Sequence, residues 1–239
     1  MELERFETAF SKLTDMFSTE GFYKNPNRFE IDVFGKIAHY QLQALIITGR
    51  LEEDIALSKA NTQYIFDCVK EGKEINDDEM KKGILNHVKL DLDLFDFYIY
   101  TRQFLDAITI GIKLSFISAG NKNAGIMKHT ASCLLNKNKF QMYKSNIDSQ
   151  FFTGLEKHLK WIVKLKDSRD DLIHQQNYFV YTNTRQGESG YDIMDREKKE
   201  WGTDTVKPIL AEVQTVINNL TELIEYLHDN LPRKEVAKI

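Results

Sequence analysis

The chain has 239 residues, of which 42% are hydrophobic and 28% are charged, and its formal net charge is −4. This composition is typical of a globular chain that can bury a core, and the length favours one domain with an extension. A net negative charge gives no general argument for a nucleic-acid partner. The most apolar stretch, residues 95–116, contains four charged residues, which excludes a membrane span there.

Cysteine content and the first residues of the chain bear on its compartment. Cys68 and Cys133 are isolated and neither belongs to a Cys-x-x-Cys pair, so the sequence indicates a reducing compartment without a disulfide framework. The chain begins with an acidic amphipathic segment that lacks the apolar region of a signal peptide. We therefore expect a soluble, cytoplasmic protein that does not associate with membranes.

The chain has only three prolines, and because proline interrupts helices, this low content predicts long helices. Apolar residues at helical spacing predict helices over 3–17, 30–48, 51–70, 77–118, 149–176 and 205–230. The second and third of these are divided near Gly49, and 121–148 is expected to hold short helices with a loop. Tyr178–Tyr181 and Tyr191–Met194, with a turn-like segment between them, predict a small β-hairpin over about 178–195.

These elements define a mostly α fold: a bundle of long antiparallel helices with a small β-hairpin inserted before the last helix. We expect residues 1–29 to form an N-terminal helix and loop extension, and 30–230 to form the helical domain. Residues 231–239, after the final helix, are expected to be a mobile tail.

Basic residues gather in one window of this acidic chain. Residues 121–169 contain ten Lys and Arg residues and three acidic residues, a net charge of +7, which leaves −11 for the rest. Such a segment can bind a polyanion, or it can be an ordinary solvated helix face. The charge count alone leaves both interpretations open.

Several common catalytic motifs are absent from the sequence. There is no phosphate-binding glycine loop followed by Lys-Ser or Lys-Thr, no His-Glu-x-x-His and no Gly-x-Ser-x-Gly. One group of residues has side chains that could bind a metal ion: His87, Asp91, Asp93 and Asp96. Of these, His87 and Asp91 are four residues apart and share a helix face. Since Asp93 and Asp96 are expected to point elsewhere, a solvated acidic face is the better interpretation, and we expect no metal and no cofactor.

The run from Arg169 to His174 carries the one credible chemical site. Asp170 and Asp171 precede His174 by four and three residues, so on a helix both carboxylates can approach the imidazole. Nearby negative charge orients that ring and favours its protonated form, which suits a general acid or base. Arg169 lies about 140° round the helix from His174. Its long side chain can still reach the same pocket and hold a phosphate.

Three lysines before this run, Lys160, Lys164 and Lys166, extend the positive charge and could contact a nucleic-acid backbone. An ordinary surface helix with Asp–Lys and Asp–His pairs accounts for the same residues. Residue spacing by itself does not distinguish the two interpretations.

Arg169, Asp170 and His174 resemble the Arg-(polar)-x-x-x-His signature of the higher eukaryotes and prokaryotes nucleotide-binding (HEPN) domain family, in its shortest form. The surrounding pattern is similar: an all-helical chain, a long preceding helix with Tyr98, Arg102 and Asp106, and the signature before a final helix. The resemblance covers roughly residues 30–230. The hairpin and the helix before Asn25 go beyond the minimal family pattern.

The resemblance implies a homodimeric, metal-independent endoribonuclease in which Arg and His of two protomers form one cleft, with a role in toxin or defence systems. It implies that the 2′-hydroxyl of RNA attacks the adjacent phosphate. His174 would then be the general acid or base, Arg169 would stabilise the phosphate, and Asp170 would orient one of them. An antitoxin or another protein partner fits the same class.

Asp106 is a supporting candidate, because it lies in an apolar stretch where a carboxylate needs a partner. Arg102, four residues earlier, can be that partner, as can Arg169 across the bundle. The alternative function is a non-catalytic helical module that binds a protein or a nucleotide. The acidic remainder of the chain suits a protein partner better than RNA.

Overall fold

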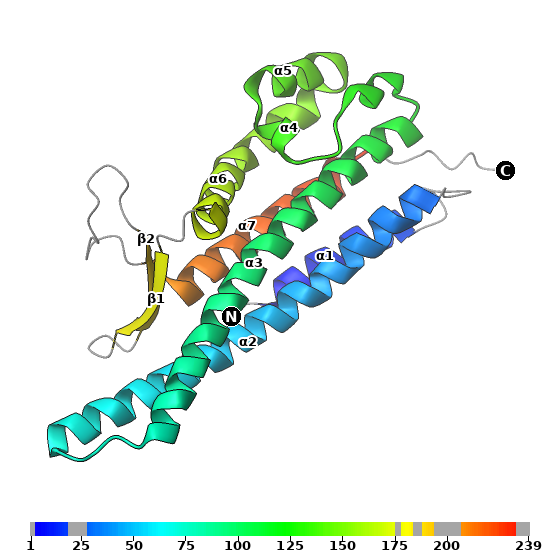
Figure 1. Cartoon of the computed structure of the whole chain (residues 1–239). Coiled ribbons are helices and arrows are strands. Elements are labelled where there is room, and N and C mark those ends of the chain that lie inside the picture. Colours follow the sequence, from blue (N-terminus) through cyan, green and yellow to red (C-terminus); the bar gives the residue numbers. More distant parts are fainter. Residues whose placement is uncertain (1–2, 19–27, 175–177, 184–187, 194–206, 233–239) are drawn as a thin grey trace. The chain divides into compact units, whose positions relative to one another are not determined.

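The computed structural model describes residues 3–18, 28–174, 178–183, 188–193 and 207–232 (Figure 1). Side chains are described for 3–16, 35–40, 42–167 and 208–232. Most of the described residues are helical, which confirms the predicted mostly α fold. The predicted tail beyond Pro232 lies outside the described residues, and the division of the chain at residues 29 and 230 stays a prediction.

The described helices follow the predicted order. They are α1 (Leu3–Ser18), α2 (Arg28–Glu71), α3 (Asp77–Ser118), α4 (Ser132–Leu135), α5 (Lys137–Asn146), α6 (Ser149–His174) and α7 (Ile209–Asn230), with a 3₁₀-helix η1 (Lys122–Ile126) before α4. The prediction that a loop or break near Gly49 divides 30–70 is wrong, because α2 is continuous there. A helix interior tolerates one glycine at a cost of about 1 kcal/mol, so the neighbouring residues carry the helix through.

Between α6 and α7, the backbone of β1 (Tyr178–Asn183) pairs antiparallel with β2 (Glu188–Ile193), and Tyr178 is opposite Ile193. A two-residue strand, β3 (Lys207–Pro208), pairs antiparallel with β2. The side chains of β1 and β2 lie outside the described set. A folded hairpin as an insertion in the bundle therefore stays a prediction.

Local chemistry explains where the long helices begin and end. Asp77, Asp78 and Glu79 occupy the first turn of α3, where acids suit the positive end of the helix dipole. The Asn76 side chain accepts a hydrogen bond from the Asp78 amide at 2.8 Å. After α2, Gly72 has φ +66°, a conformation that glycine adopts without strain.

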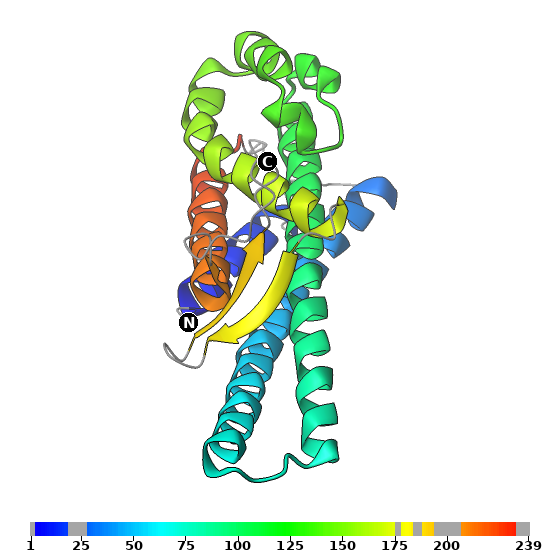
Figure 2. The same cartoon turned by 60° about the vertical axis from the view of Figure 1, so that its left-hand side comes forward.

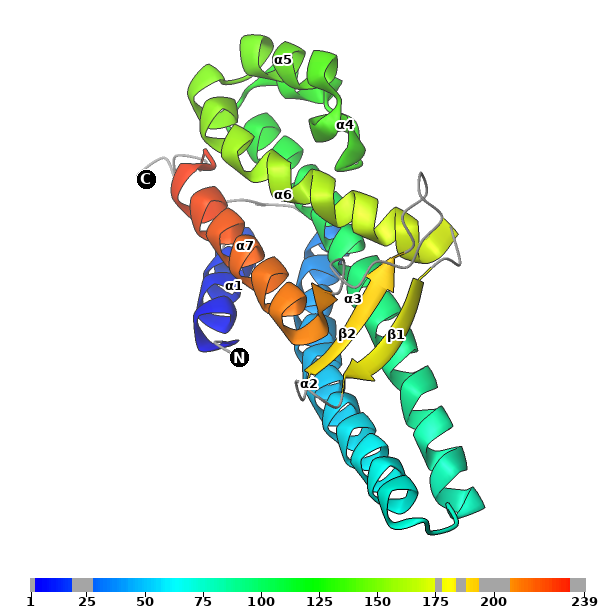
Figure 3. The same cartoon turned by 90° about the vertical axis from the view of Figure 1, so that its left-hand side faces the viewer.

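The chain divides into two compact units. The first consists of Met1–Ala44, Tyr100–Lys166 and Val216–Ile239. In it, α7 lies between α1 and α6 (Figure 3). Arg5 of α1 makes a two-pronged ion pair with Glu225 of α7, at 2.6 and 3.0 Å. Phe10 of α1 stacks on Phe104 of α3, with ring centroids 5.1 Å apart.

Phe152 of α6 is the centre of the aromatic core in this unit. It is fully buried, and the rings of Phe116, Phe140 and Tyr143 pack around it. The Tyr226 hydroxyl of α7 donates to the Phe151 carbonyl of α6 at 2.5 Å. These contacts join α3, α5, α6 and α7 through buried aromatic rings. Aromatic side chains bury a large apolar area each, so they dominate the stability of such a core.

The second unit consists of Leu45–Ile99 and Asp167–Thr215. Its larger helical part is a hairpin in which the end of α2 and the beginning of α3 run side by side to their connecting loop (Figure 2). Arg50 pairs with Asp93, and the Asn61 amide donates to the Glu79 carbonyl at 2.8 Å. Leu90, Leu94 and Phe97 of α3 are fully buried in this hairpin.

No helix among the described residues has a stretch long and apolar enough to cross a membrane. The predicted cytoplasmic location stays a prediction.

Candidate functional site

The candidate Arg169–His174 run lies on the last turns of α6, whose backbone is helical from Ser149 through His174. The predicted helix over this run is therefore present, and Arg169, Asp170 and His174 occupy one continuous element. Their side chains lie outside the described set, so their mutual approach stays a prediction.

The described part of α6 is amphipathic, with one buried apolar face and one exposed polar face. Phe152, Leu155, Ile162 and Leu165 are buried, as the apolar spacing predicts. Lys160 and Lys164, four residues apart, are exposed, whereas Lys166 is half-buried. The same helix that leads to Arg169 thus presents at least two solvated ammonium groups, which suits contact with phosphates.

Arg102 and Asp106 are brought together by α3, and their side chains lie 3.5 Å apart. Asp106 also accepts a hydrogen bond from the Ala131 amide at 2.6 Å, and Arg102 donates to the Ser132 hydroxyl at 2.6 Å. Ala131 precedes α4 and supplies no capping side chain of its own. Asp106 therefore satisfies an amide at the beginning of α4 and places a negative charge at the favourable end of that helix.

This geometry gives Asp106 and Arg102 a structural role that does not require a reaction. It agrees with the local-pair interpretation of Asp106. Any approach of Arg169 to Asp106 involves a side chain outside the described residues.

The expected solvated acidic face on α3 is wrong for Asp93, which is only 1% exposed. Asp93 lies three residues after buried Leu90 and four before buried Phe97, so it shares the core-facing side of the helix. That spacing was the available signal in the sequence. Among the described residues, no cluster of three or more His, Cys, Asp or Glu side chains could hold a metal ion.

Sequence reasoning missed the cluster that Asp93 forms with Arg50 and Asp54 in the α2–α3 hairpin. Burial is the largest cause that raises the pKa of Asp93, and together with the neighbouring Asp54 carboxylate it brings the pKa to about 6 against the lowering effect of Arg50. The second Asp93 oxygen, Oδ2, is buried without a hydrogen-bond partner. Asp93 thus pairs with one arginine while a second buried carboxylate lies beside it, which favours a proton on Asp93.

His158 of α6 was also missed. It is 2% exposed, packs on the Tyr226 ring at 5.5 Å, and its Nε2 lacks a hydrogen-bond partner. Burial and then the neighbouring Lys157 lower the pKa of His158 to about 4. A neutral histidine enclosed in this way serves packing, so it is a poor candidate for proton transfer with an RNA in solution.

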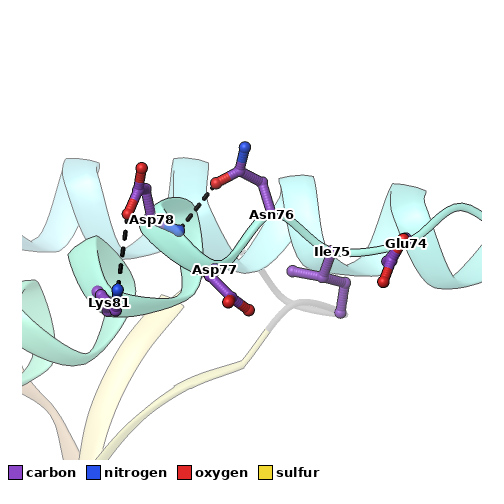
Figure 4. A pocket seen from close by; sticks show the side chains of 6 residues that line it. All are labelled: Glu74, Ile75, Asn76, Asp77, Asp78 and Lys81. Carbon is purple, nitrogen blue, oxygen red and sulfur yellow. Dashed lines mark hydrogen bonds and ion pairs between the residues drawn. The ribbon is translucent and has the colours of Figure 1, made fainter.

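A shallow pocket is present at the loop between α2 and α3 (Figure 4). Its lining consists of Glu74, Ile75, Asn76, Asp77, Asp78 and Lys81. Figure 4 shows Asp78 directed to Lys81, and their charged atoms are 3.7 Å apart. Three acids against one lysine make this pocket unsuitable for a phosphate group.

Comparison with known proteins gives no relative. No family model matches the chain, and no curated protein and no solved structure matches it.

Proposed function

We propose that this protein is a HEPN-like, metal-independent endoribonuclease, and that Arg169, Asp170 and His174 are its site. The observation that carries the proposal is the unbroken helical backbone of α6, which leads from exposed Lys160 and Lys164 to the Arg-Asp-x-x-x-His run. The long helix α3 before it and the final helix α7 after it follow the order that the family resemblance implies.

In the proposed reaction, the 2′-hydroxyl oxygen of one nucleotide forms a bond to the adjacent phosphorus, and the bond to the 5′-oxygen of the next nucleotide breaks. His174 takes up or supplies the proton that moves between these oxygens. Arg169 holds the phosphate and stabilises the charge that develops on it. Asp170 orients one of the two, and Lys160, Lys164 and Lys166 contact the RNA backbone.

The proposal includes three further features. Two copies of the chain bring Arg169 and His174 together across a two-fold axis, the segment of β1 and β2 forms a small hairpin beside the site, and the protein serves a toxin or defence role in the cytoplasm. The antiparallel register from Tyr178 opposite Ile193 to Asn183 opposite Glu188 supports the hairpin.

Two observations favour a second candidate, a non-catalytic module that binds a protein. Outside residues 121–169 the chain carries a net charge of −11, which would repel RNA, and α3 exposes several apolar side chains. In that case the Arg–His run would be structural.

Cleavage of a labelled mixed-sequence RNA in excess EDTA distinguishes the two. Wild type is compared with Arg169→Ala and His174→Ala, and His87→Ala serves as the matched control because it removes a histidine of the rejected metal-like group. We expect wild type and His87→Ala to cut, and the two site variants to lose at least about a hundredfold in rate. If folded, dimeric wild type leaves the RNA intact, the binding module is the better account.

A further inference from the structure

The α3 part of the second unit has two apolar faces, and only one of them is buried. Leu90, Leu94 and Phe97 on one face are fully buried. Leu85, Val88 and Leu92 are 55%, 48% and 56% exposed. At 100° per residue the exposed set lies roughly opposite the buried set, so helix α2 cannot cover it.

The exposed face has the spacing of a coiled coil. Apolar residues recur in alternating steps of three and four, at Leu85, Val88, Leu92, Phe95 and Ile99, and we name these five residues the α3 seam. Phe95 and Ile99 are half-buried. The positions that would continue the pattern are Lys81 and Arg102, so the seam is bounded by charge and is about 22 Å long.

Charge flanking the seam selects its occupant. Lys89 and Asp96 border the same edge of the seam, seven residues apart. In an antiparallel pair of α3 helices with the two-fold axis between Leu92 and Phe95, Lys89 lies opposite Asp96 of the partner subunit. The two-fold axis repeats this attractive pair, so the dimer contains it twice. Four of the five seam residues then form apolar layers, because Leu92 meets the partner's Phe95 and Val88 meets the partner's Ile99, while Leu85 lies opposite the partner's Arg102 at the end of the seam.

The parallel arrangement is disfavoured by the same residues. In a parallel pair, Asp91 on the other edge of the seam would lie opposite Asp96 of the partner subunit, which repeats a like-charge contact twice. We propose that a second copy of this chain packs antiparallel on the α3 seam. A monomeric wild type would contradict both this proposal and the two-fold site of the proposed ribonuclease, whereas Leu92→Asp and the charge variants below test the seam alone.

The seam covers only two heptads, so the association is expected to be concentration-dependent rather than permanent. We expect sedimentation equilibrium of the full chain to show a monomer–dimer equilibrium between roughly 1 and 300 µM. Leu92→Asp places a charge in the centre of the seam and should leave only monomer. Val69→Asp is the matched control, because Val69 is 67% exposed on α2, off the seam, and should leave the equilibrium unchanged.

Charge exchange tests the antiparallel register. Lys89→Glu and Asp96→Lys each replace two attractive pairs by two repulsive ones, and each alone should weaken self-association about tenfold. Mixing the two variants should restore association in trans. The glutamate introduced in one chain then faces the lysine introduced in the other, and the unaltered Asp96 of the first chain faces the unaltered Lys89 of the second. A structural role of either residue within its own chain would not produce this rescue.

Thermal unfolding of each variant shows first that the fold is retained. The proposal is overturned if wild type stays monomeric throughout the concentration range, if Leu92→Asp behaves as Val69→Asp does, or if the mixed charge variants fail to associate. A monomeric wild type would mean that another part of this chain, or a different protein, covers the seam.

Discussion

Asp93 has a carboxyl group that the α2–α3 hairpin encloses almost completely. Arg50 compensates its charge only in part, and Asp54 adds a second carboxylate beside it. Its pKa of about 6 lies well above the value of 3.8 expected for an exposed aspartate. The folded chain therefore holds this proton more tightly than the unfolded chain does, and linkage makes the stability depend on pH.

For this group, the extra stability is fully present below pH 3.8 and is lost as the pH rises through about 6. Asp93→Asn removes the titration. We expect the free energy of unfolding of wild type to fall relative to Asp93→Asn by about 2 kcal/mol between pH 4 and pH 7. Urea unfolding at a series of pH values measures this difference. A constant difference between the two proteins would contradict the buried, protonated state.

Asp54→Asn provides the matched variant. It removes the neighbouring carboxylate that raises the pKa of Asp93, so the loss of stability should shift to lower pH. An unchanged profile in Asp54→Asn would show that burial alone sets the pKa.

The pKa of His158 is shifted downward, so its effect on the pH dependence of stability is opposite to that of Asp93. Its pKa of about 4 is below the ordinary value of 6.5, so its contribution to stability is present above pH 6.5 and is lost as the pH falls toward 4. Phenylalanine retains the ring that packs on Tyr226 and removes the unpartnered Nε2. We expect His158→Phe to raise the melting temperature at pH 5 by several degrees relative to wild type, and to change it little at pH 7.5.

Thermal melts of both proteins at the two pH values test this expectation. An equal effect of the substitution at pH 5 and pH 7.5 would mean that the imidazole does not titrate inside the fold.

At the residue scale, the sequence predicts chemistry along one helix better than contacts between helices. Arg102 and Asp106 are four residues apart, and their pairing follows from helical spacing. The Ala131 amide that donates to Asp106 is 25 residues away and could not be predicted from spacing. The partner of Asp93 is on another helix, so the periodicity indicates that Asp93 is buried but not that Arg50 compensates it.

At the scale of elements, two glycines show how the α2–α3 hairpin is packed. Gly83 of α3 lies against the Asn61 side chain of α2, and a Cβ atom there would collide with it. The Asn61 amide is already engaged with the Glu79 carbonyl. Gly49 of α2 has open space around the position of a Cβ atom.

Alanine substitutions separate the effect of close packing from that of helix propensity. We expect Gly83→Ala to lower the free energy of unfolding by about 1 to 2 kcal/mol, since Asn61 must give up its hydrogen bond or the helices must separate. Gly49→Ala should raise it by up to about 1 kcal/mol, because alanine is the better helix former. Equal effects of the two substitutions, measured by urea unfolding, would contradict the close approach of α2 and α3 at Gly83.

Helix periodicity was sufficient to predict α1, α3, α6 and α7 to within a few residues at most ends. The prediction of a helix boundary at Gly49 is wrong, because a residue of low helix propensity does not by itself end a helix. Nothing after Gly49 stops the helix: Arg50 and Leu51 continue the pattern, and the first glycine described with a left-handed backbone is Gly72. A glycine marks a helix end only where the backbone requires positive φ.

At the scale of the whole molecule, charge and apolar surface point to different partners. The basic window of residues 121–169 has the charge that the proposed RNA contact requires, whereas the α3 seam has the spacing of a surface that binds another helix. The two surfaces are compatible with a protein that binds RNA as a dimer. The helix that carries Arg169, Asp170 and His174 could be predicted from the sequence. Contacts of these side chains with other helices could not, because periodicity does not encode tertiary contacts.

The most direct test of the proposed activity compares an RNA with its fully 2′-O-methylated counterpart, both in excess EDTA with dimeric protein. If the 2′-hydroxyl is the nucleophile, the RNA is cut and leaves 2′,3′-cyclic phosphate ends, while the methylated strand stays intact. Cleavage of both strands, or of neither, would contradict the account of Arg169 and His174 as a metal-independent ribonuclease site.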